Sequence, residues 1–253
     1  MPGASVSEID RLIARMAALL EPLEREADPR RFFLATYMRT TEAVKDELAR
    51  GGFLDGEWTQ EWDIAFADLY ADALEKWNRG DPVPAPWEVA FDAARGERLP
   101  PLRHVLLALN AHVNYDLPQS LLAVITDREF DDPALVAQRG ADHRHIDEIL
   151  AARVPQEDRE LAKAEQPGDR TLLDRLLTPF NRAGTKRFLK EGRRKVWSNA
   201  RTLSRARRVG SEAFAAKLEE LEALSAARVR ELRAPGQVLL KLAARGFGVL
   251  LSP

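Results

Sequence analysis

The sequence contains no cysteine among its 253 residues. This excludes disulfides, thiolate metal sites and cysteine nucleophiles, and makes a reducing cytoplasm the expected compartment. No uncharged apolar run approaches the roughly 18 to 20 residues that a membrane-spanning helix needs, so we expect no transmembrane segment. The start, "MPGASVSEIDRLIARMAALLEPLE", carries acids at Glu8 and Asp10 and lacks the basic-then-apolar order of a signal peptide.

Several common active-site motifs are missing as well. The chain has no Gly-x-x-x-x-Gly-Lys, Gly-x-Gly-x-x-Gly, Gly-x-Ser-x-Gly or His-Glu-x-x-His. We therefore expect no nucleotide cofactor and no nicotinamide or serine-hydrolase chemistry. Zinc-finger, helix-turn-helix and RNA-binding patterns are also lacking, so nucleic acid is not the expected partner.

Runs of alternating β-branched residues are absent, whereas turn and cap signals divide the chain into helical segments. Aromatic residues from Trp58 to Trp77 recur every three or four positions, which is typical of the buried stripe of one helix. The sequence thus predicts an all-α fold, a multi-helix bundle. The expected helices cover residues 28–51, 56–78, 87–95, 102–116, 118–127, 132–153, 156–165, 170–178, 181–208, 211–233 and 236–250.

Charge is distributed unevenly along the chain. Residues 1–168 carry 19 Lys and Arg against 32 Asp and Glu, a net charge of −13, while residues 169–253 carry 19 against 8, a net charge of +11. With "QPGD" at 166–169 as the boundary, we predict an acidic helical core domain over 1–165 and basic helices over 166–253 that dock on it. The alternative is that the basic run within 181–208 binds an anionic partner.

The stretch "LNAHVNYDLPQSL", residues 109–121, interrupts a leucine-rich run with polar side chains. His112 and Asp116 are four residues apart, which places them on one helix face, where they could share a metal ion or a proton. A purely structural interpretation is also open. Because Pro118 disfavours helical geometry at the residue before it, Asp116 could instead cap a new helix, with Gln119 completing a capping box.

Other candidates could complete a site around this pair. Zinc takes three or four ligands, and His143 and His145 in "GADHRHIDEIL" are predicted as further metal ligands beside His112 and Asp116. His104 lies two turns before His112. We expect at least one of these histidines, or Asp63, to share a polar cavity with the pair.

Three polar residues are candidates for binding a ligand or cofactor. Asn110 and Asn114 are also four apart, and they suggest a polar cavity or a shell of hydrogen bonds that fixes the His112 tautomer. Asp63 lies at the edge of the aromatic stripe. It either belongs to the cavity or forms an ion pair with an arginine such as Arg39 or Arg103.

Four segments together resemble a bacterial family of all-helical proteins of unknown function. They are "FFLATYMRTTEAV", "GGFLDGEWTQEWDIAFADLYADAL", "PLRHVLLALNAHVNYDLPQSL" and "DHRHIDEIL". Members of that family share a His-x-x-x-Asp-Leu-Pro signature, matched here by His112, Asp116, Leu117 and Pro118. The resemblance covers roughly residues 8–200 and implies a helical fold.

More remotely, "AHVNYDLPQSL" is similar to the His-x-x-x-Asp helix of the helical zinc-dependent phospholipase C and single-strand nuclease group, where such a pair binds zinc. Those enzymes have a further histidine shortly after the proline, and this chain has Leu121 and Leu122 there. The amino-terminal tryptophan ligand of the group is replaced by the start Met-Pro-Gly. These departures argue against a trinuclear zinc site and leave a single ion as the open alternative.

Two classes of function follow from these patterns. The first is a small helical enzyme of hydrolase or lyase type that acts on a small molecule, with a polar pocket around His112 and Asp116. A divalent metal, zinc first, could activate water or polarise the substrate there. The second is a non-catalytic binding or assembly module that uses the basic helices of the second half.

Overall fold

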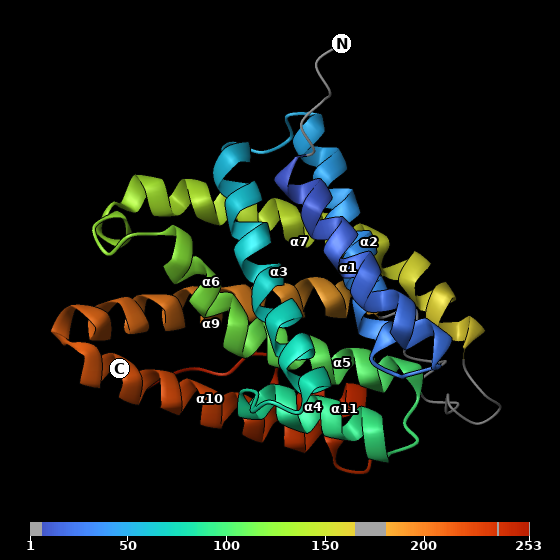
Figure 1. Ribbon diagram of the computed structural model, residues 1–253. Coiled ribbons are helices and arrows are strands. Elements are labelled where there is room, and N and C mark those ends of the chain that lie inside the picture. Colours follow the sequence, from blue (N-terminus) through green and yellow to red (C-terminus); the bar gives the residue numbers. More distant parts are fainter. Residues whose placement is uncertain (1–6, 165–180, 237, 253) are drawn as a thin grey trace.

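The structure is a computed structural model that describes residues 7–164, 181–236 and 238–252, and every regular element in these ranges is a helix (Figure 1). The all-α prediction is confirmed. The proposed boundary at 166–169 and the helix expected at 170–178 lie outside the described residues. The elements are α1 (Glu8–Arg25), α2 (Arg31–Ala49), α3 (Gly56–Arg79), α4 (Ala85–Gly96), α5 (Pro101–Ala111), η1 (His112–Asp116), α6 (Leu117–Val124), η2 (Glu129–Asp131), α7 (Pro133–Lys163), α9 (Asn181–Val209), α10 (Ser211–Arg233) and α11 (Val238–Arg245).

Several helices begin and end at the residues that local chemistry favours. The Ser7 hydroxyl accepts a hydrogen bond from the Asp10 backbone at the start of α1, and the Asp55 carboxylate does the same for Trp58 at the start of α3. Gly80, with φ of 80°, ends α3 in the left-handed conformation that glycine adopts without strain. Across residues 7–164, 181–236 and 238–252, no helix combines the length and apolar character of a membrane span.

The prediction of two helices over 132–153 and 156–165 is wrong, because α7 runs through both with Pro155 inside it. A proline removes one hydrogen bond of the helical ladder and crowds the preceding turn. Here Glu157 links the two sides of the proline, since it accepts a hydrogen bond from Arg153 at 2.9 Å and also pairs with Arg39 of α2. Contacts with another helix thus hold α7 together where its own sequence weakens it.

Two apolar clusters hold the bundle together, and each contains residues from both halves of the chain. In the first, Leu34 and Leu107 pack with Leu232 and Leu242. In the second, buried tryptophans and leucines from α3 and α6 pack with α9 and α10. The helices after residue 180 therefore complete the core of the earlier ones and cannot be removed without exposing it.

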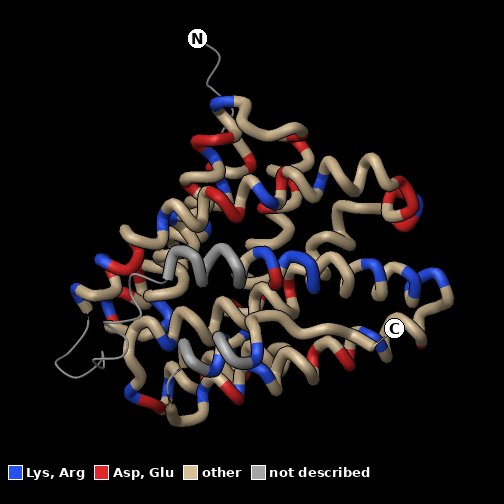
Figure 2. Tube along the Cα trace, turned by 180° about the vertical axis from the view of Figure 1, so that it is seen from behind, with Lys and Arg blue, Asp and Glu red and all other residues tan. Residues whose placement is uncertain are grey.

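Ion pairs also join the basic helix α9 to the earlier helices. Arg207 binds Asp127 at 2.6 Å, Arg208 binds Asp131 at 2.7 Å, and Arg193 pairs with Asp147 of α7. Figure 2 shows basic positions recurring along α9, with the acidic loop before α7 at the carboxyl-terminal end of that helix. The predicted docking of a basic helical extension on the bundle is confirmed.

Candidate functional site

The segment His112–Asp116 forms a π-helix, η1, that joins α5 to α6 in one continuous helical stretch. The Leu117 N–H donates to the His112 carbonyl, five residues back. Pro118 provides a physical reason for the wider turn, because its ring crowds the carbonyl four residues earlier and it has no N–H to donate. Short π-helical insertions of this kind are frequent at functional sites.

The interpretation of Asp116 as a helix cap is wrong. Asp116 has helical dihedral angles, φ −80° and ψ −39°, and its side chain makes no capping hydrogen bond to α6. Gln119 donates to the Tyr115 carbonyl at 2.8 Å instead of completing a capping box. The π-helix keeps the chain helical through the proline, so the Asp116 carboxylate remains on the His112 face.

His112 and Asp116 form a buried pair. The His112 Nδ1 atom lies 2.8 Å from Asp116 Oδ2, and the indole Nε1 of Trp87 donates to the same oxygen at 2.9 Å. His112 and Asp116 are each 2% exposed. An oxygen that meets two N–H donors is best served by an ionised carboxylate, which places the imidazole proton on Nδ1 and leaves the lone pair on Nε2.

Burial sets the protonation of the pair. Loss of solvent lowers the pKa of the His112 imidazole, and the hydrogen bond that His112 donates to Asp116 opposes this effect only in part. Burial also raises the pKa of the Asp116 carboxyl, against the hydrogen bonds from His112 and Trp87. His112 is therefore a neutral base near pH 7, held in one orientation by its partner.

Five aromatic side chains surround the imidazole and form what we call the aromatic cluster. Phe66 stacks on it with a centroid distance of 3.6 Å and an interplanar angle of 5°, and Tyr37 meets it edge-on at 4.9 Å. The other three rings lie 5.8 to 6.0 Å away. The members are Phe33, Tyr37, Phe66, Tyr70 and Trp87. Of these, Phe66 alone is only half-buried, so it marks the side of the cluster nearest to solvent.

Three buried polar atoms at this site have no hydrogen-bond partner among the described residues: His112 Nε2, Tyr37 Oη and Asp63 Oδ2. The negative charges of Asp63 and Asp116 both contribute to raising the pKa of Tyr37, after the larger effect of burial. These groups therefore share one electrostatic environment. Burying polar groups without partners costs roughly 1 to 3 kcal/mol each, so these three atoms do not stabilise the fold through hydrogen bonds to the described residues.

Asp63 does not form an ion pair with Arg39 or Arg103, which was one of the two hypotheses for its side chain. Arg39 pairs with Glu157, and Arg103 donates to the Gly236 carbonyl. Burial instead raises the pKa of Asp63 to about 7. A carboxyl group with this pKa is present in both protonation states near neutral pH, which is useful for proton transfer.

Asn110 and Asn114 lie on the other side of the helix and bind backbone of the segment 247–252. Both amides donate to the Phe247 carbonyl, at 3.2 and 3.3 Å, and Asn114 accepts from the Val249 N–H at 3.0 Å. The Asn114 amide also donates to Asn110 at 3.0 Å. The expectation that they fix the imidazole tautomer needs correction, because Asp116 makes that contact.

The other histidines have surroundings of their own. His143 is buried and accepts a hydrogen bond from the Trp197 indole at 3.1 Å, and burial lowers its pKa to about 3. His145 is near the surface, with Nε2 2.9 Å from Glu47. His104 packs beside Phe33 and Tyr70 on the outer side of these rings, where burial lowers its pKa to about 4.

The predicted ligand set of His112, Asp116, His143 and His145 is not brought together. Within the part of the chain that the structure describes, no three His, Asp or Glu side chains are grouped as metal ligands would be. His112 Nδ1 is engaged with Asp116, while His143 and His145 bind Trp197 and Glu47. Near the His112–Asp116 pair, His112 Nε2 and Asp63 Oδ2 are the potential donor atoms that have no hydrogen-bond partner among the described residues.

Sequence reasoning did not identify Trp87 or Tyr37 as part of the site. Trp87 lies in the first turn of α4, and α4 packs on α5, which brings the indole to Asp116. Tyr37 lies on the buried face of α2 with Phe33 and Val44, and its hydroxyl is what distinguishes it from an apolar core residue. The sequence signal that could have identified this residue is a tyrosine at a buried position where phenylalanine would pack equally well.

The comparisons with known proteins identify the family of the chain and add no activity. None of the curated proteins and none of the solved structures compared with the chain matches it. One family does match, over residues 9–235, which include His112, Asp116 and the whole aromatic cluster. The chain belongs to that family, a family of unknown function (DUF5995).

Proposed function

We propose that the protein is a small helical enzyme of hydrolase or lyase type, with His112 as its general base and a small molecule as its substrate. One observation supports this above all. The imidazole is oriented through Nδ1 by a buried carboxylate, and Nε2 carries a lone pair with no hydrogen-bond partner. Such an arrangement is what proton abstraction requires.

The surrounding groups have complementary roles in the proposal. His112 Nε2 accepts a proton from the substrate or from an attacking water, and Asp116 stabilises the imidazolium that results. Asp63, with a pKa of about 7, returns a proton to the leaving group. The Tyr37 hydroxyl donates a hydrogen bond to charge that develops in the transition state.

Access to the imidazole runs past Phe66. Phe66 lies flat on His112, and it is half-buried while the other four rings of the aromatic cluster are buried. A substrate therefore reaches His112 when the Phe66 side chain rotates away. The aromatic walls favour a substrate with an apolar body and one or two polar groups at the reacting end.

A substrate panel of p-nitrophenyl acetate, butyrate and phosphate tests the proposal together with His112→Gln. We expect turnover in at least one case, with a rate that rises with pH through a pKa below 6.5, and a loss of about 10²- to 10⁴-fold in the variant. His145→Gln is the matched control at a surface histidine and should keep full turnover. Equal rates for His112→Gln and the unmodified protein would contradict the proposal.

A second measurement does not depend on knowing the substrate. Nitrogen NMR of the histidine side chains reports the tautomer of each imidazole. The proposal requires a proton on Nδ1 of His112 and none on Nε2 at pH 7. A signal from the opposite tautomer would remove the base from the proposed mechanism.

A divalent ion, zinc first, is a further part of the proposal that can be tested separately. Its support is chemical, since an unpaired imidazole nitrogen and an unpaired carboxylate oxygen are both zinc donors. Elemental analysis of protein purified without chelator or metal-affinity resin measures whether zinc is bound. Stoichiometric zinc that disappears in His112→Gln places the ion at this site, whereas an active, metal-free protein leaves the acid–base groups as the whole centre.

A further inference from the structure

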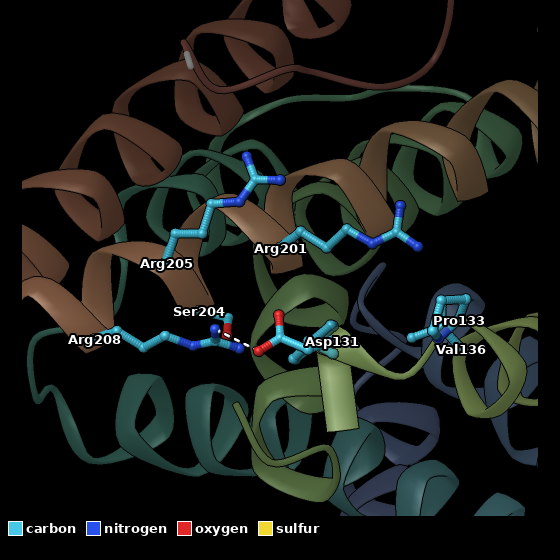
Figure 3. Close-up of a pocket in the computed structure, with 8 residues that line it drawn as sticks. Asp131, Pro133, Val136, Arg201, Ser204, Arg205 and Arg208 are labelled. Atoms are coloured by element: carbon cyan, nitrogen blue, oxygen red, sulfur yellow. Dashed lines mark hydrogen bonds and ion pairs between the residues drawn. The ribbon is translucent and has the colours of Figure 1, made fainter. Parts of the chain in front are cut away.

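A second candidate site lies away from His112, between α9 and the loop that leads into α7. A cavity of about 210 Å³ opens there. It has a basic side and an apolar side, and its lining residues are Phe130, Asp131, Pro133, Val136, Arg201, Ser204, Arg205 and Arg208. Figure 3 shows Arg201 extending along α9 toward Pro133 and Val136, and Arg208 joined to Asp131.

Two arginines on the basic side of the cavity have no charged partner within the part of the chain that the structure describes. Arg208 is paired with Asp131 at 2.7 Å. Arg201 and Arg205 are exposed and have no hydrogen bond or ion pair among the described residues. They are four residues apart on one helix, a spacing at which like charges repel. An anion held between them would remove that repulsion.

Two neighbouring side chains of α9, Ser204 and Arg207, are hydrogen-bonded within the protein and do not compete with the arginines for a ligand. Ser204 donates its hydroxyl hydrogen to Asp127 at 2.6 Å, and Arg207 makes a forked contact with the same carboxylate. These contacts fix this part of α9 against the loop. The backbone that presents Arg201 and Arg205 is therefore rigid, which favours binding because little order has to be created.

The balance of charge in the lining selects the kind of anion. Three arginines and one aspartate give a net charge of +2. A phosphate monoester carries about −1.5 to −2 near pH 7 and can accept forked hydrogen bonds from arginine. A carboxylate, with a single charge, would leave one of the two guanidinium groups unmatched.

The apolar side of the cavity defines the rest of the ligand. Phe130 is buried beneath the cavity, and Pro133 and Val136 form its wall. This wall has no polar side chain to offer a sugar or a peptide. We propose that the cavity binds a small phosphate monoester whose phosphate lies between Arg201 and Arg205 and whose apolar body lies against Val136 and Pro133.

The acidic residues at the rim favour a small ligand over a nucleic acid. Asp131 is largely exposed beside the cavity, and Asp127 precedes it by four residues in the same loop region. A polynucleotide would have to carry successive phosphates past these carboxylates, with repulsion at each step. A single phosphate can enter between the arginines without that cost.

Calorimetric titration of the full chain with phenyl phosphate tests the proposal. We expect saturable one-to-one binding that strengthens as the pH rises through about 6, where the phosphate becomes a dianion. The double variant Arg201→Gln/Arg205→Gln should bind at least tenfold more weakly. Lys190→Gln/Arg194→Gln is the matched control, because it removes the same charge from exposed positions of α9 outside the cavity, and it should bind as the unmodified protein does.

Further titrants separate the sources of binding. Inorganic phosphate should bind more weakly than phenyl phosphate, and benzyl alcohol should not bind at all. The proposal is overturned by any of three results. The first is the absence of saturable phenyl phosphate binding at millimolar concentrations. The second is an equal loss of affinity for phenyl phosphate in the two double variants. The third is displacement of phenyl phosphate by a single-stranded oligonucleotide that binds more tightly.

Discussion

Residues 110–116 carry buried polar side chains on two sides of one helix, and the two sides differ in how completely those side chains are hydrogen-bonded. On one side, Asn110 and Asn114 bind the backbone of segment 247–252. On the other side, His112 and Asp116 bind each other, and His112 Nε2 has no partner among the described residues.

The two sides also differ in what they contribute to the stability of the fold. Asn199 of α9 extends the first side, since it accepts from the Leu251 N–H at 2.9 Å and donates to the Val249 carbonyl at 3.2 Å. Segment 247–252 has no regular secondary structure, and these amides take the place of a neighbouring strand. The asparagine side therefore stabilises the fold, while the histidine side retains unpaired groups at a cost in stability.

The largest expected effect comes from Asn114→Leu. The change removes the acceptor of the Val249 N–H and a donor to the Phe247 carbonyl. Buried backbone groups left unpaired, together with the crowding by leucine, should lower the free energy of unfolding by about 3 to 5 kcal/mol. Urea denaturation measures it. A midpoint for Asn114→Leu equal to that of the unmodified protein would refute the structural role.

Asp63→Asn should change how stability depends on pH. In the folded protein the pKa of Asp63 is raised from 3.8 to about 7, because the core accepts the protonated carboxyl and disfavours the ionised one. The contribution of this group to the free energy of unfolding is therefore fully present below pH 3.8 and is lost as the pH rises through 7. The asparagine variant does not titrate. Relative to the unmodified protein, it should therefore gain at most about 4 kcal/mol between pH 4 and pH 8, the value that corresponds to the pKa difference.

Denaturation of both proteins across that pH range provides the measurement. The buried histidines titrate in both proteins, so their effect cancels in the difference. A constant difference between pH 4 and pH 8 would show that Asp63 is ionised and paired in the folded state, which would contradict its burial without a partner for Oδ2 among the described residues.

Asp116→Asn should have a smaller effect on stability and a clear effect on His112. The amide oxygen can still accept from both N–H donors, His112 and Trp87, but both hydrogen bonds weaken without the negative charge, so we expect a loss of about 1 to 2 kcal/mol. Loss of the negative charge should lower the imidazole pKa further, since Asp116 is what raises it. NMR titration of His112 would contradict the pairing if the variant titrated at an unchanged pH.

The sequence predicted most of the fold but only part of the site. Helix class and the docking of the basic helices follow from periodicity and charge, which are local properties of the chain. The His112–Asp116 pair was found because its spacing is also local. Two assignments needed the folded chain: Asn110 and Asn114 meet a segment more than 130 residues away, and Trp87 reaches Asp116 from a different helix.

The metal prediction shows the same limit. Histidines that are close in sequence need not converge, because helix packing decides where each side chain points. His143 is turned toward Trp197 and His145 toward Glu47. The continuity of α7 through Pro155 was hidden for a similar reason, since the contact between Glu157 and Arg39 joins segments 118 residues apart.

Tyr37→Phe has the smallest expected effect on stability and tests the central claim most directly. The Tyr37 hydroxyl is buried without a partner among the described residues, so its removal leaves packing intact and relieves an unpaired polar group. Thermal unfolding should show a free energy of unfolding unchanged or raised by up to about 1 kcal/mol, while turnover in the assay that responds to His112→Gln should fall. A loss of stability of about 1 kcal/mol or more with unchanged turnover would show that the hydroxyl serves the fold, and the histidine side of the helix would then be structural like the asparagine side.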